Sequence, residues 1–366
     1  MKIIHTESSC GWGGQEIRIL SEARGMIERG HTVTLVCPPT SGIFRAAATY
    51  GVPTVALPIY KKRLTDFLAL RRWLRDNDPI DVINTHSSTD SWLTALACAT
   101  LAGAPPIVRT RHVSAPISTN WPTRWLYGRA SAHVVTTGET LRHAVLAVTG
   151  LPEERVTSVP TGIDTDRYTP GDRTTARAAL DLDQTTPIVG IVATLRSWKG
   201  HRYLIEALAS LPLRINLLIV GDGPQRAALA SQVAELGLTD RVRFTGNRED
   251  VPLWLQAFDV FVLPSYANEG VPQALMQAMA VGLPCVTTSV GAIGELAQDG
   301  ETALVVPAKN AAAIAAALQR LLGEAELRQR LGAAARTRVV AGFARSLMVE
   351  RMEKLFYAVV KGAACN

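Results

Sequence analysis

Short apolar runs alternate with longer amphipathic stretches along most of the chain. In the first 165 residues, seven of these runs predict β-strands, at positions 2–6, 33–37, 55–59, 81–85, 107–110, 133–137 and 156–160. The stretches between them have the periodicity of helices. Strands that alternate with helices of about 10 to 15 residues are typical of βαβ units, and strands that are apolar on both faces indicate a buried parallel sheet. The first half therefore predicts a doubly wound α/β domain.

The same pattern restarts after a polar stretch at residues 166–186, where we expect the hinge between two domains. Six more strands are predicted, at 188–193, 215–220, 242–245, 260–263, 285–288 and 303–306. A final amphipathic segment begins at residue 346, far beyond these strands. The sequence thus predicts a Rossmann-like domain at 1–165 and another at 166–345, with a terminal helix at 346–366 that packs back on the first.

Composition and the cysteines narrow the class of protein. Of 366 residues, 47% are hydrophobic and 19% are charged, which excludes disordered, collagen-like and coiled-coil chains. The five cysteines are scattered and none lies in a CxxC pair, so neither a disulfide framework nor a zinc site is expected. A reducing, cytoplasmic setting fits this pattern best.

Targeting segments and charge add little more. The chain turns polar directly after its first apolar run, so we expect no secretory signal. Two uncharged stretches, 91–108 and 270–294, contain prolines and glycines that favour buried helices, turns and strands over membrane spans. The net charge of +6 is compatible with phosphorylated ligands, an anionic membrane surface or nucleic acid, and does not choose among them.

Candidate chemistry in the first half lies at strand ends, because ligands of open parallel sheets bind at the carboxyl ends of the strands. Glycines at 11, 13 and 14 follow the first strand and precede a helix, where free N–H groups attract anions. An ordinary tight turn is the alternative interpretation. The glycines lack the GxGxxG spacing of a dinucleotide-binding fingerprint. His86 and His112 end the fourth and fifth strands. A single histidine is usually structural, but two at adjacent strand ends favour a site.

The second half carries the more specific signals. Arg196 and Lys199 precede a helix start and would clamp a phosphate, unless this is an ordinary solvated turn. Loops containing Gly221 and Gly246 follow the next strands and could surround a nucleotide. Glu269 precedes a helix expected from residue 272, whose N–H groups could hold phosphate while the carboxylate binds sugar hydroxyls. Helix capping is the alternative for this glutamate.

The order of these motifs resembles a retaining GT-B glycosyltransferase of family 4. The matching runs are Trp-Lys-Gly at 198–200, Val-Gly-Asp-Gly-Pro at 220–224, Phe-Thr-Gly at 244–246, and Glu-Gly at 269–270 followed by Gln-Ala-Met-Ala at 277–280. The first-half glycine loop, His112 and the segment 159–164 match as well. The resemblance implies that the nucleotide of an activated sugar binds mainly to the second domain and the acceptor mainly to the first.

The resemblance also implies a role for each matching residue. Arg196 and Lys199 would hold the diphosphate, Glu269 would bind the sugar, and His112 would meet the sugar from the first domain; these four are the catalytic candidates. Further donor contacts are expected from Gly13, Gly14, Thr194, Gly221, Gly246, Asn247, Arg248, Gly270, Val271 and Gln277. The acceptor-side candidates are Trp12, His86 and Arg111.

Two positions depart from the family pattern. Gln277 replaces the second glutamate of the E-x7-E spacing, and Thr194 stands where the family has an arginine. The resemblance implies no metal and no cofactor; the phosphate of the departing nucleoside diphosphate would assist deprotonation of the acceptor on the same face. The DxD-like triplets at 164–166 and 181–183 lie away from the strand ends, so we do not expect them to bind a metal.

The acceptor is suggested by a basic segment at residues 60–75. It has six cations, with Phe67, Leu70 and Leu74 at helical spacing. This pattern is typical of a helix on a membrane surface, and equally of a helix that packs on the sheet and exposes a basic face to water. A second basic and aromatic cluster lies at 121–129. Together they favour a lipid-linked acceptor at the inner face of the cytoplasmic membrane.

The expected activity is therefore transfer of a hexose-type sugar from a UDP- or GDP-sugar to a glycan or lipid-linked acceptor. The resemblance points to bacterial envelope polysaccharides such as lipopolysaccharide, O-antigen or capsule. One alternative is a GT-B nucleotide-sugar 2-epimerase, which needs carboxylates from both domains; no first-half Asp or Glu is suitably placed. Another is a scaffold whose catalysis has lapsed, supported by Gln277 alone. Nucleic-acid binding is not expected.

Overall fold

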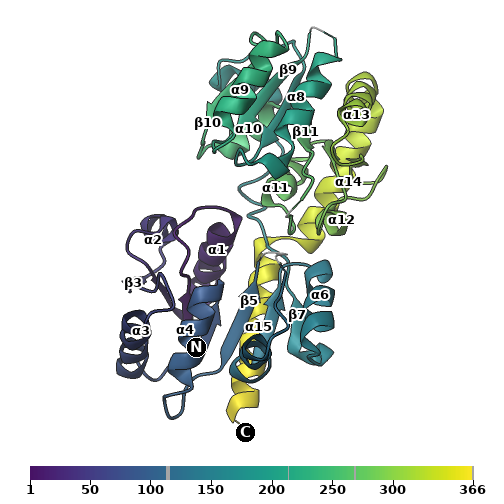
Figure 1. Ribbon diagram of the computed structural model, residues 1–366. Coiled ribbons are helices and arrows are strands. Elements are labelled where there is room, and N and C mark those ends of the chain that lie inside the picture. Colours follow the sequence, from purple (N-terminus) through teal and green to yellow (C-terminus); the bar gives the residue numbers. More distant parts are fainter. Residues whose placement is uncertain (113–115, 213, 268, 365–366) are drawn as a thin grey trace. The chain divides into compact units, whose positions relative to one another are not determined.

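The computed structural model describes residues 1–112, 116–212, 214–267 and 269–364 (Figure 1). The chain divides into two compact units. Unit 1 consists of Met1–Gly162 and Arg345–Asn366, and unit 2 of Ile163–Ala344. Each unit has one parallel sheet with helices on both faces, which confirms the two predicted Rossmann-like folds. None of the described helices is long and apolar enough to cross a membrane.

The sheet of unit 1 has the strand order β3-β2-β1-β4-β5-β6-β7 in the described part of the chain. The strands are β1 (Lys2–Thr6), β2 (Thr32–Cys37), β3 (Thr54–Ala56), β4 (Val82–Thr85), β5 (Ile107–Arg111), β6 (His133–Thr136) and β7 (Val156–Ser158). Ile3 and Ile4 of β1 point to opposite faces of the sheet, and both are fully buried. Burial on both faces explains why apolar residues occupy adjacent positions in these strands, as at Ile3 and Ile4 or at Val134 and Val135.

Seven helices and three short helical turns surround this sheet among the described residues. The helices are α1 (Gly14–Glu28), α2 (Gly42–Ala47), α3 (Leu64–Asp76), α4 (Ser88–Cys98), α5 (Trp121–Trp125), α6 (Glu139–Thr149) and α15 (Arg345–Ala364). The turns are η1 (Ala48–Tyr50), η2 (Leu126–Ala130) and η3 (Glu153–Arg155).

The terminal helix α15 packs against α1 of unit 1. A Cβ atom on Gly25 would lie 2.3 Å from a methyl carbon of Val349, so a glycine is needed where the two helices meet. Met352 and Phe356 are fully buried in the same hydrophobic cluster as Met26. The last helix therefore completes the core of the first unit.

Unit 2 has the strand order β10-β9-β8-β11-β12-β13 within the described residues. Its strands are β8 (Ile188–Val192), β9 (Asn216–Val220), β10 (Val242–Gly246), β11 (Val260–Leu263), β12 (Cys285–Thr287) and β13 (Leu304–Val305). Its helices are α7 (Arg173–Ala179), α8 (His201–Ala209), α9 (Arg226–Glu235), α10 (Val251–Ala257), α11 (Gln273–Val281), α12 (Ile293–Leu296), α13 (Ala311–Gly323) and α14 (Ala325–Gly342), with a short turn η4 (Ser197–Lys199). Separate apolar clusters cover the two faces of the sheet.

The polar stretch 166–186 is not the hinge that the sequence predicts, because the chain passes between the units at Gly162 and Ile163. The stretch contains α7, whose first turn is capped by the carboxylate of Asp172, 2.7 Å from the Thr175 N–H. Asp183, one of the DxD-like aspartates, accepts hydrogen bonds from Thr185 and Thr186. These side chains cap local structure, which explains the polar composition.

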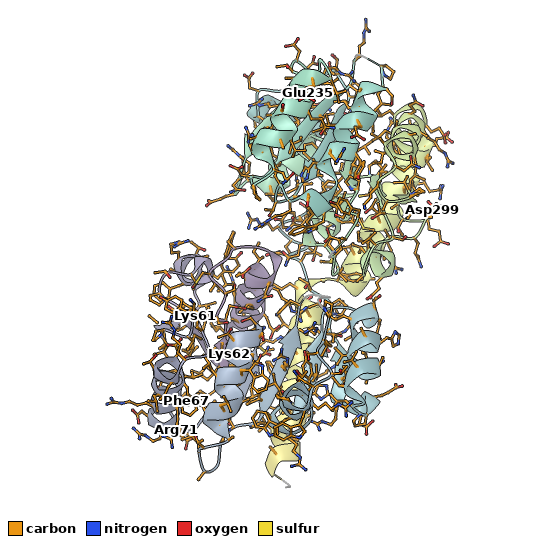
Figure 2. The ribbon with its side chains drawn as sticks, in the orientation of Figure 1. Lys61, Lys62, Phe67, Arg71, Glu235 and Asp299 are labelled. Carbon is orange, nitrogen blue, oxygen red and sulfur yellow. The ribbon has the colours of Figure 1, made fainter. Side chains whose placement is uncertain are left out.

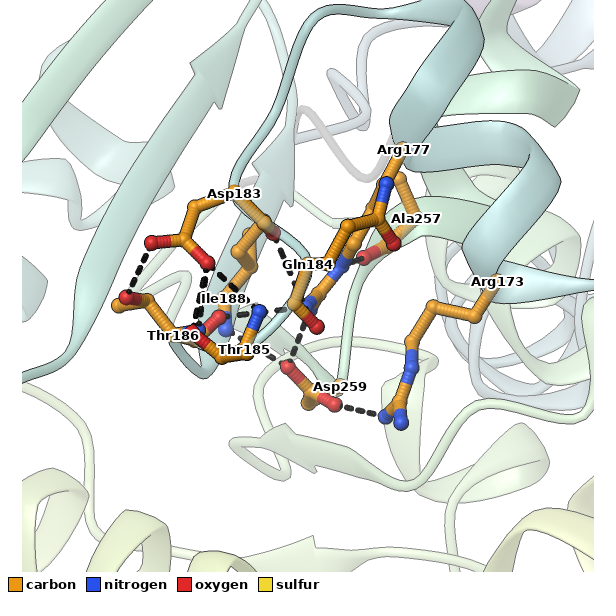
Figure 3. Close-up of polar contacts among 9 residues, drawn as sticks. All are labelled: Arg173, Arg177, Asp183, Gln184, Thr185, Thr186, Ile188, Ala257 and Asp259. Atoms are coloured by element: carbon orange, nitrogen blue, oxygen red, sulfur yellow. Dashed lines mark hydrogen bonds and ion pairs between the residues drawn. The ribbon is translucent and has the colours of Figure 1, made fainter.

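Arg177 anchors this stretch to the rest of unit 2 (Figure 3). Its buried guanidinium donates to the carbonyl of Ala257 at 3.0 Å and to Asp259 at 2.6 Å. Asp259 also pairs with Arg173 and accepts the Ile188 N–H at 2.7 Å. The segment expected to be a linker is therefore an integral part of the second unit.

Candidate active site

Three loops lie against one another at the carboxyl edge of the unit 2 sheet. The N–H of Gly221, after β9, donates to the carbonyl of Gly246 at 2.8 Å, and the N–H of Leu195, after β8, donates to the carbonyl of Asp222 at 3.0 Å. Gly221 has a φ of +134°, and a Cβ there would lie 2.1 Å from the carbonyl oxygen of Ala193. Only glycine allows the loops to approach this closely.

Several predicted donor-binding residues lie on these loops. The exposed ones are Thr194, Arg196, Asn247 and Arg248. The guanidinium of Arg196 lies 5.7 Å from the ring centre of Trp198, and Arg248 forms an ion pair with Asp250 at 2.8 Å. Arg196 is thus available at the edge of the sheet, whereas Arg248 already has an acidic partner.

Lys199 and Glu269 are brought together from two different loops. The Lys199 Nζ lies 2.6 Å from Oε1 of Glu269, and the hydroxyl of Ser265 donates to the same oxygen at 2.6 Å. Glu269 is only 4% exposed, so its charge is compensated by the lysine rather than by water. This pair is the centre of the candidate site on unit 2.

The backbone around this pair depends on two glycines. Gly200 has a φ of +78°, and a Cβ there would lie 2.1 Å from the carbonyl oxygen of Pro264. Gly291 has a φ of +62°, and a Cβ there would lie 2.0 Å from the carbonyl oxygen of Glu269. These two contacts hold the Lys199 loop and the Glu269 loop against their neighbours.

The segment after Glu269 leads into α11. Gly270 is partly exposed, while the side chain of Val271 is buried in the core, so Val271 offers a ligand its backbone alone. Gln277 is partly exposed on α11, one turn after Gln273, and the neighbouring Met276 is fully buried. The amide of Gln277 therefore lies on the face of α11 that is not in the core.

In unit 1, three histidines form a chain of hydrogen bonds. Nδ1 of His5 lies 2.8 Å from Nε2 of His86, and Nδ1 of His86 lies 3.0 Å from Nε2 of His112. The rings of His5 and His86 are stacked, with centroids 5.1 Å apart. The structure therefore brings His86 and His112 together and adds His5, which the sequence analysis did not select.

Burial keeps these histidines neutral near pH 7. It lowers the pKa of His5 to about 3 and the pKa values of His86 and His112 well below the ordinary value. A neutral imidazole has one donor and one acceptor nitrogen. Each ring in the chain therefore restricts the tautomer of the next, so His5 and His86 help to set which nitrogen of His112 carries the proton.

Carboxyl groups lie at the same edge of unit 1. Glu7, directly after β1, is fully buried and accepts the Ser9 N–H at 2.6 Å, while the Ser9 hydroxyl donates to Glu16 at 2.5 Å. Burial, followed by the negative charge of Asp90, raises the pKa of Glu7 to about 8. Acidic side chains therefore surround the N-terminus of α1 at Gly13 and Gly14, where the sequence predicted a site for anions.

Glu7 is a first-half acidic residue that the sequence analysis did not select. The available signal is its position directly after a predicted strand, at the ligand-binding edge. Its side chain is fully buried, so the expectation that no first-half carboxylate is placed for a 2-epimerase stays a prediction.

The other acceptor-side candidates lie on two different elements. Trp12 is exposed on the loop before α1, and that loop packs closely on Gly42, where a Cβ would lie 2.7 Å from the carbonyl oxygen of Gly11. Arg111 ends β5, and its Nη1 donates to the hydroxyl of Tyr127 at 3.0 Å. Trp12 comes after β1 and Arg111 ends β5, so both lie toward the carboxyl ends of their strands, as His86 and His112 do.

Comparison with known proteins decides the family. The family model for Glycosyltransferase Family 4 matches residues 12–167, and the model for Glycosyl transferases group 1 matches residues 172–338. The lipopolysaccharide core biosynthesis mannosyltransferase LpsB of Rhizobium meliloti (strain 1021) is 33% identical over 252 residues, which are 66% of this chain and 68% of that protein. The chain belongs to the GT-B glycosyltransferases.

Two more similarities bear on this GT-B glycosyltransferase. The D-inositol 3-phosphate glycosyltransferase of Nocardia farcinica is 33% identical over 253 residues, which span 62% of this chain but only 56% of that protein. The crystal structure of Anabaena Alr3699/HepE in complex with UDP-glucose has a TM-score of 0.85 at 21% identity, over 98% of this chain and all of that one. The second similarity supports the fold of the glycosyltransferase.

Proposed function

We propose that this GT-B glycosyltransferase transfers a hexose-type sugar from a nucleoside-diphosphate sugar to a glycan or lipid-linked acceptor, with retention and without a metal. The observation that carries the proposal is the Lys199–Glu269 pair at the carboxyl edge of unit 2, among loops held together by glycines. Cations at such an edge stabilise a departing diphosphate by charge compensation.

The contacts of the pair suggest how it acts. Lys199 is bound to Glu269 at 2.6 Å, and an incoming diphosphate would compete for the same ammonium. When Lys199 turns to the phosphate, Oε1 of Glu269 keeps its Ser265 hydrogen bond and can accept another from a sugar hydroxyl. Arg196 would add a second cation, and the neutral imidazole of His112 would contact the sugar from unit 1.

The relatives favour a donor and an acceptor class. Anabaena HepE has been crystallised with UDP and with UDP-glucose, which favours a UDP-sugar for this chain, and GDP-sugars are the alternative. LpsB of Rhizobium meliloti acts in lipopolysaccharide core biosynthesis, and LpsE of the same organism is 32% identical over 231 residues. We therefore place the acceptor among bacterial envelope glycans, with O-antigen and capsule as further candidates.

Peripheral membrane contact through residues 60–75 is part of the proposal, with a corrected apolar face. Leu70 and Leu74 are buried in the core of unit 1 and are unavailable to lipid. The exposed apolar side chains of α3 are Leu64 and Leu68, which are 71% and 51% exposed. Figure 2 shows Lys61, Lys62 and Arg71 along this segment. Cations beside exposed leucines suit the surface of an anionic bilayer.

Ligand-dependent thermal unfolding with UDP, GDP, ADP and NAD tests the donor site. A ligand at 100 times its Kd stabilises by about 2.7 kcal/mol, and we expect UDP or GDP to do so while NAD does not. Lys199→Gln should abolish this stabilisation, and Glu269→Gln should keep it but lose sugar transfer. Arg202→Gln, which removes an exposed cation of α8, is the matched control and should behave like the parent. Absence of stabilisation by every nucleoside diphosphate would overturn the proposal.

A further inference from the structure

Arg109 is a buried cation with two guanidinium nitrogens that have no hydrogen-bond partner among the described residues. It lies in the middle of β5 and is 7% exposed, and its Nε and Nη1 atoms are buried with no hydrogen bond to any described residue. Its guanidinium stacks on Tyr127, 4.6 Å from the ring centre. Removing an arginine from water is costly unless the charge is paired or hydrogen-bonded, so the missing partner points to a ligand.

The nearest acidic group does not supply that partner. Burial raises the pKa of Asp90, and the positive charge of Arg109 opposes this rise, so the two groups lie within electrostatic reach of each other. However, Oδ2 of Asp90 already accepts from the Thr6 hydroxyl and the His86 N–H, both at 2.9 Å. Its Oδ1 accepts the Ser87 N–H at 2.9 Å. No ion pair joins Arg109 to an acid within the described part of the chain.

Two further cations lie close to Arg109. Arg111 is two residues along the same face of β5, and its guanidinium donates to the hydroxyl of Tyr127, on whose ring Arg109 stacks. Lys62 precedes α3, with its Nζ 5.3 Å from the ring centre of Trp92. Partial burial and then the charge of Arg109 lower the pKa of Lys62, as expected for neighbouring cations. Positive charge is thus concentrated between aromatic rings.

We propose that Arg109, Arg111 and Lys62 form an anion-binding site on unit 1, the Arg109 site, that takes a phosphate or diphosphate group. A guanidinium matches phosphate oxygens in a bidentate geometry, and a lysine ammonium adds a point charge. Three cations suit the charge of a diphosphate better than that of a single carboxylate.

The assignment of this group to the sugar acceptor rests on the proposed function. His112, the residue proposed to meet the donor sugar, directly follows Arg111 in the chain. A phosphate bound at the Arg109 site would therefore fix one end of an acceptor close to the strand edge where transfer is proposed. Anion binding itself does not depend on that assignment.

A structural role and a ligand-binding role for Arg109 predict different changes in thermal stability when the arginine is replaced. If the arginine holds the fold together, Arg109→Met lowers the thermal midpoint. If it is kept for a ligand, the substitution removes an unpaired buried charge, keeps the apolar stem, and leaves the midpoint unchanged or raised. The free protein therefore distinguishes the two roles before any ligand is added.

Calorimetric titration of the whole chain with inorganic pyrophosphate, in saturating UDP, tests the site itself. We expect the parent to bind pyrophosphate, and Arg109→Met and Lys62→Gln to weaken binding about tenfold or more. Lys61→Gln, the neighbouring exposed lysine, is the matched control and should bind like the parent. Parent-like pyrophosphate binding by Arg109→Met, or equal losses in Lys61→Gln and Lys62→Gln, would overturn the site.

Two controls separate this result from the donor site and identify the source of the phosphate. In the first control, Arg109→Met should bind UDP like the parent. If UDP binds to neither protein, the proposed donor site is wrong. The pyrophosphate titration without UDP then still tests the Arg109 site. Co-sedimentation with vesicles of phosphatidylcholine, with or without phosphatidic acid, is the second control. Reduced binding of Arg109→Met to the acidic vesicles supports a lipid phosphate, and unchanged binding together with lost pyrophosphate binding supports a soluble one.

Discussion

Replacement of Arg177 by methionine should destabilise unit 2 far more than the same change at Arg173. Both arginines are on α7 and both contact Asp259, but Arg177 is fully buried and Arg173 is 55% exposed. Arg177 also donates to backbone carbonyls of Ala257, Gln184 and Thr186, which would lose their donor (Figure 3). Comparing the two substitutions therefore isolates the effect of burial, because the replaced residue, the helix and the acidic partner are the same.

The magnitudes follow from burial. Removing one partner of a buried ion pair costs about 3–5 kcal/mol, and Asp259 would retain Arg173 and the Ile188 N–H, which favours the lower end, about 3 kcal/mol. For a unit of this size, that corresponds to a fall of roughly 6–12 °C in the thermal midpoint. An exposed pair contributes about 1 kcal/mol or less, so Arg173→Met should lower the midpoint by no more than about 4 °C.

Hydrogen exchange in increasing urea measures the loss of stability separately for unit 1 and unit 2. Peptides from α7 and β8 report the opening of unit 2, and peptides from β1 and β4 in unit 1 serve as the internal reference. We expect Arg177→Met to lose protection in unit 2 alone. Equal effects of Arg173→Met and Arg177→Met, or a change below about 1 kcal/mol for Arg177→Met, would refute the argument that this buried arginine holds residues 166–186 to the sheet.

Two predictions concern the ionisable groups of unit 1. Burial raises the pKa of Glu7 from 4.5 to about 8, so its contribution to stability is fully present below pH 4.5 and is lost as the pH rises through 8. Glu7→Gln should flatten the pH dependence of the urea midpoint in this range and exceed the parent in stability above pH 8; an unchanged slope would contradict the shift. His86→Phe should change the tautomer ratio of His112, measured by nitrogen-15 NMR of the imidazoles, and leave UDP binding intact. An unchanged ratio would exclude coupling through the histidine chain.

The strands could be predicted because burial on both faces leaves a local signature. The predicted strands at 2–6 and 260–263 have the bounds of β1 and β11; β11 is a continuous apolar run, and β1 has apolar residues at the adjacent positions 3 and 4. The polar stretch 166–186 could not be assigned in the same way. The partner that buries Arg177 is Asp259, 82 residues further along the chain, and no local pattern reveals that pairing.

The candidate site of unit 2 could be found in part for the same reason. Lys199 and Glu269 stand next to glycines after predicted strands, which marks the ligand-binding edge of a parallel sheet. Their ion pair joins residues 70 positions apart, so it emerges only in the folded chain. The face of α11 on which Gln277 lies was equally beyond sequence reasoning, because it depends on which side of the helix the core covers.

The residues that sequence reasoning missed share one property, which is polarity within or directly after a buried strand. His5 lies in β1, Arg109 lies in β5, and Glu7 follows β1. Each is buried, although burial opposes the charged form of each side chain. A fold tolerates such a residue only where a neighbour or a ligand compensates for the lost water: His5 has the histidine chain and Glu7 has its raised pKa, but Arg109 has neither. Strands β1, β4 and β5 are adjacent in the sheet, so this polarity is concentrated in the middle strands of unit 1. A polar residue inside a strand that should be apolar is therefore the sequence signal for function in this fold, and at Arg109 it points to a ligand.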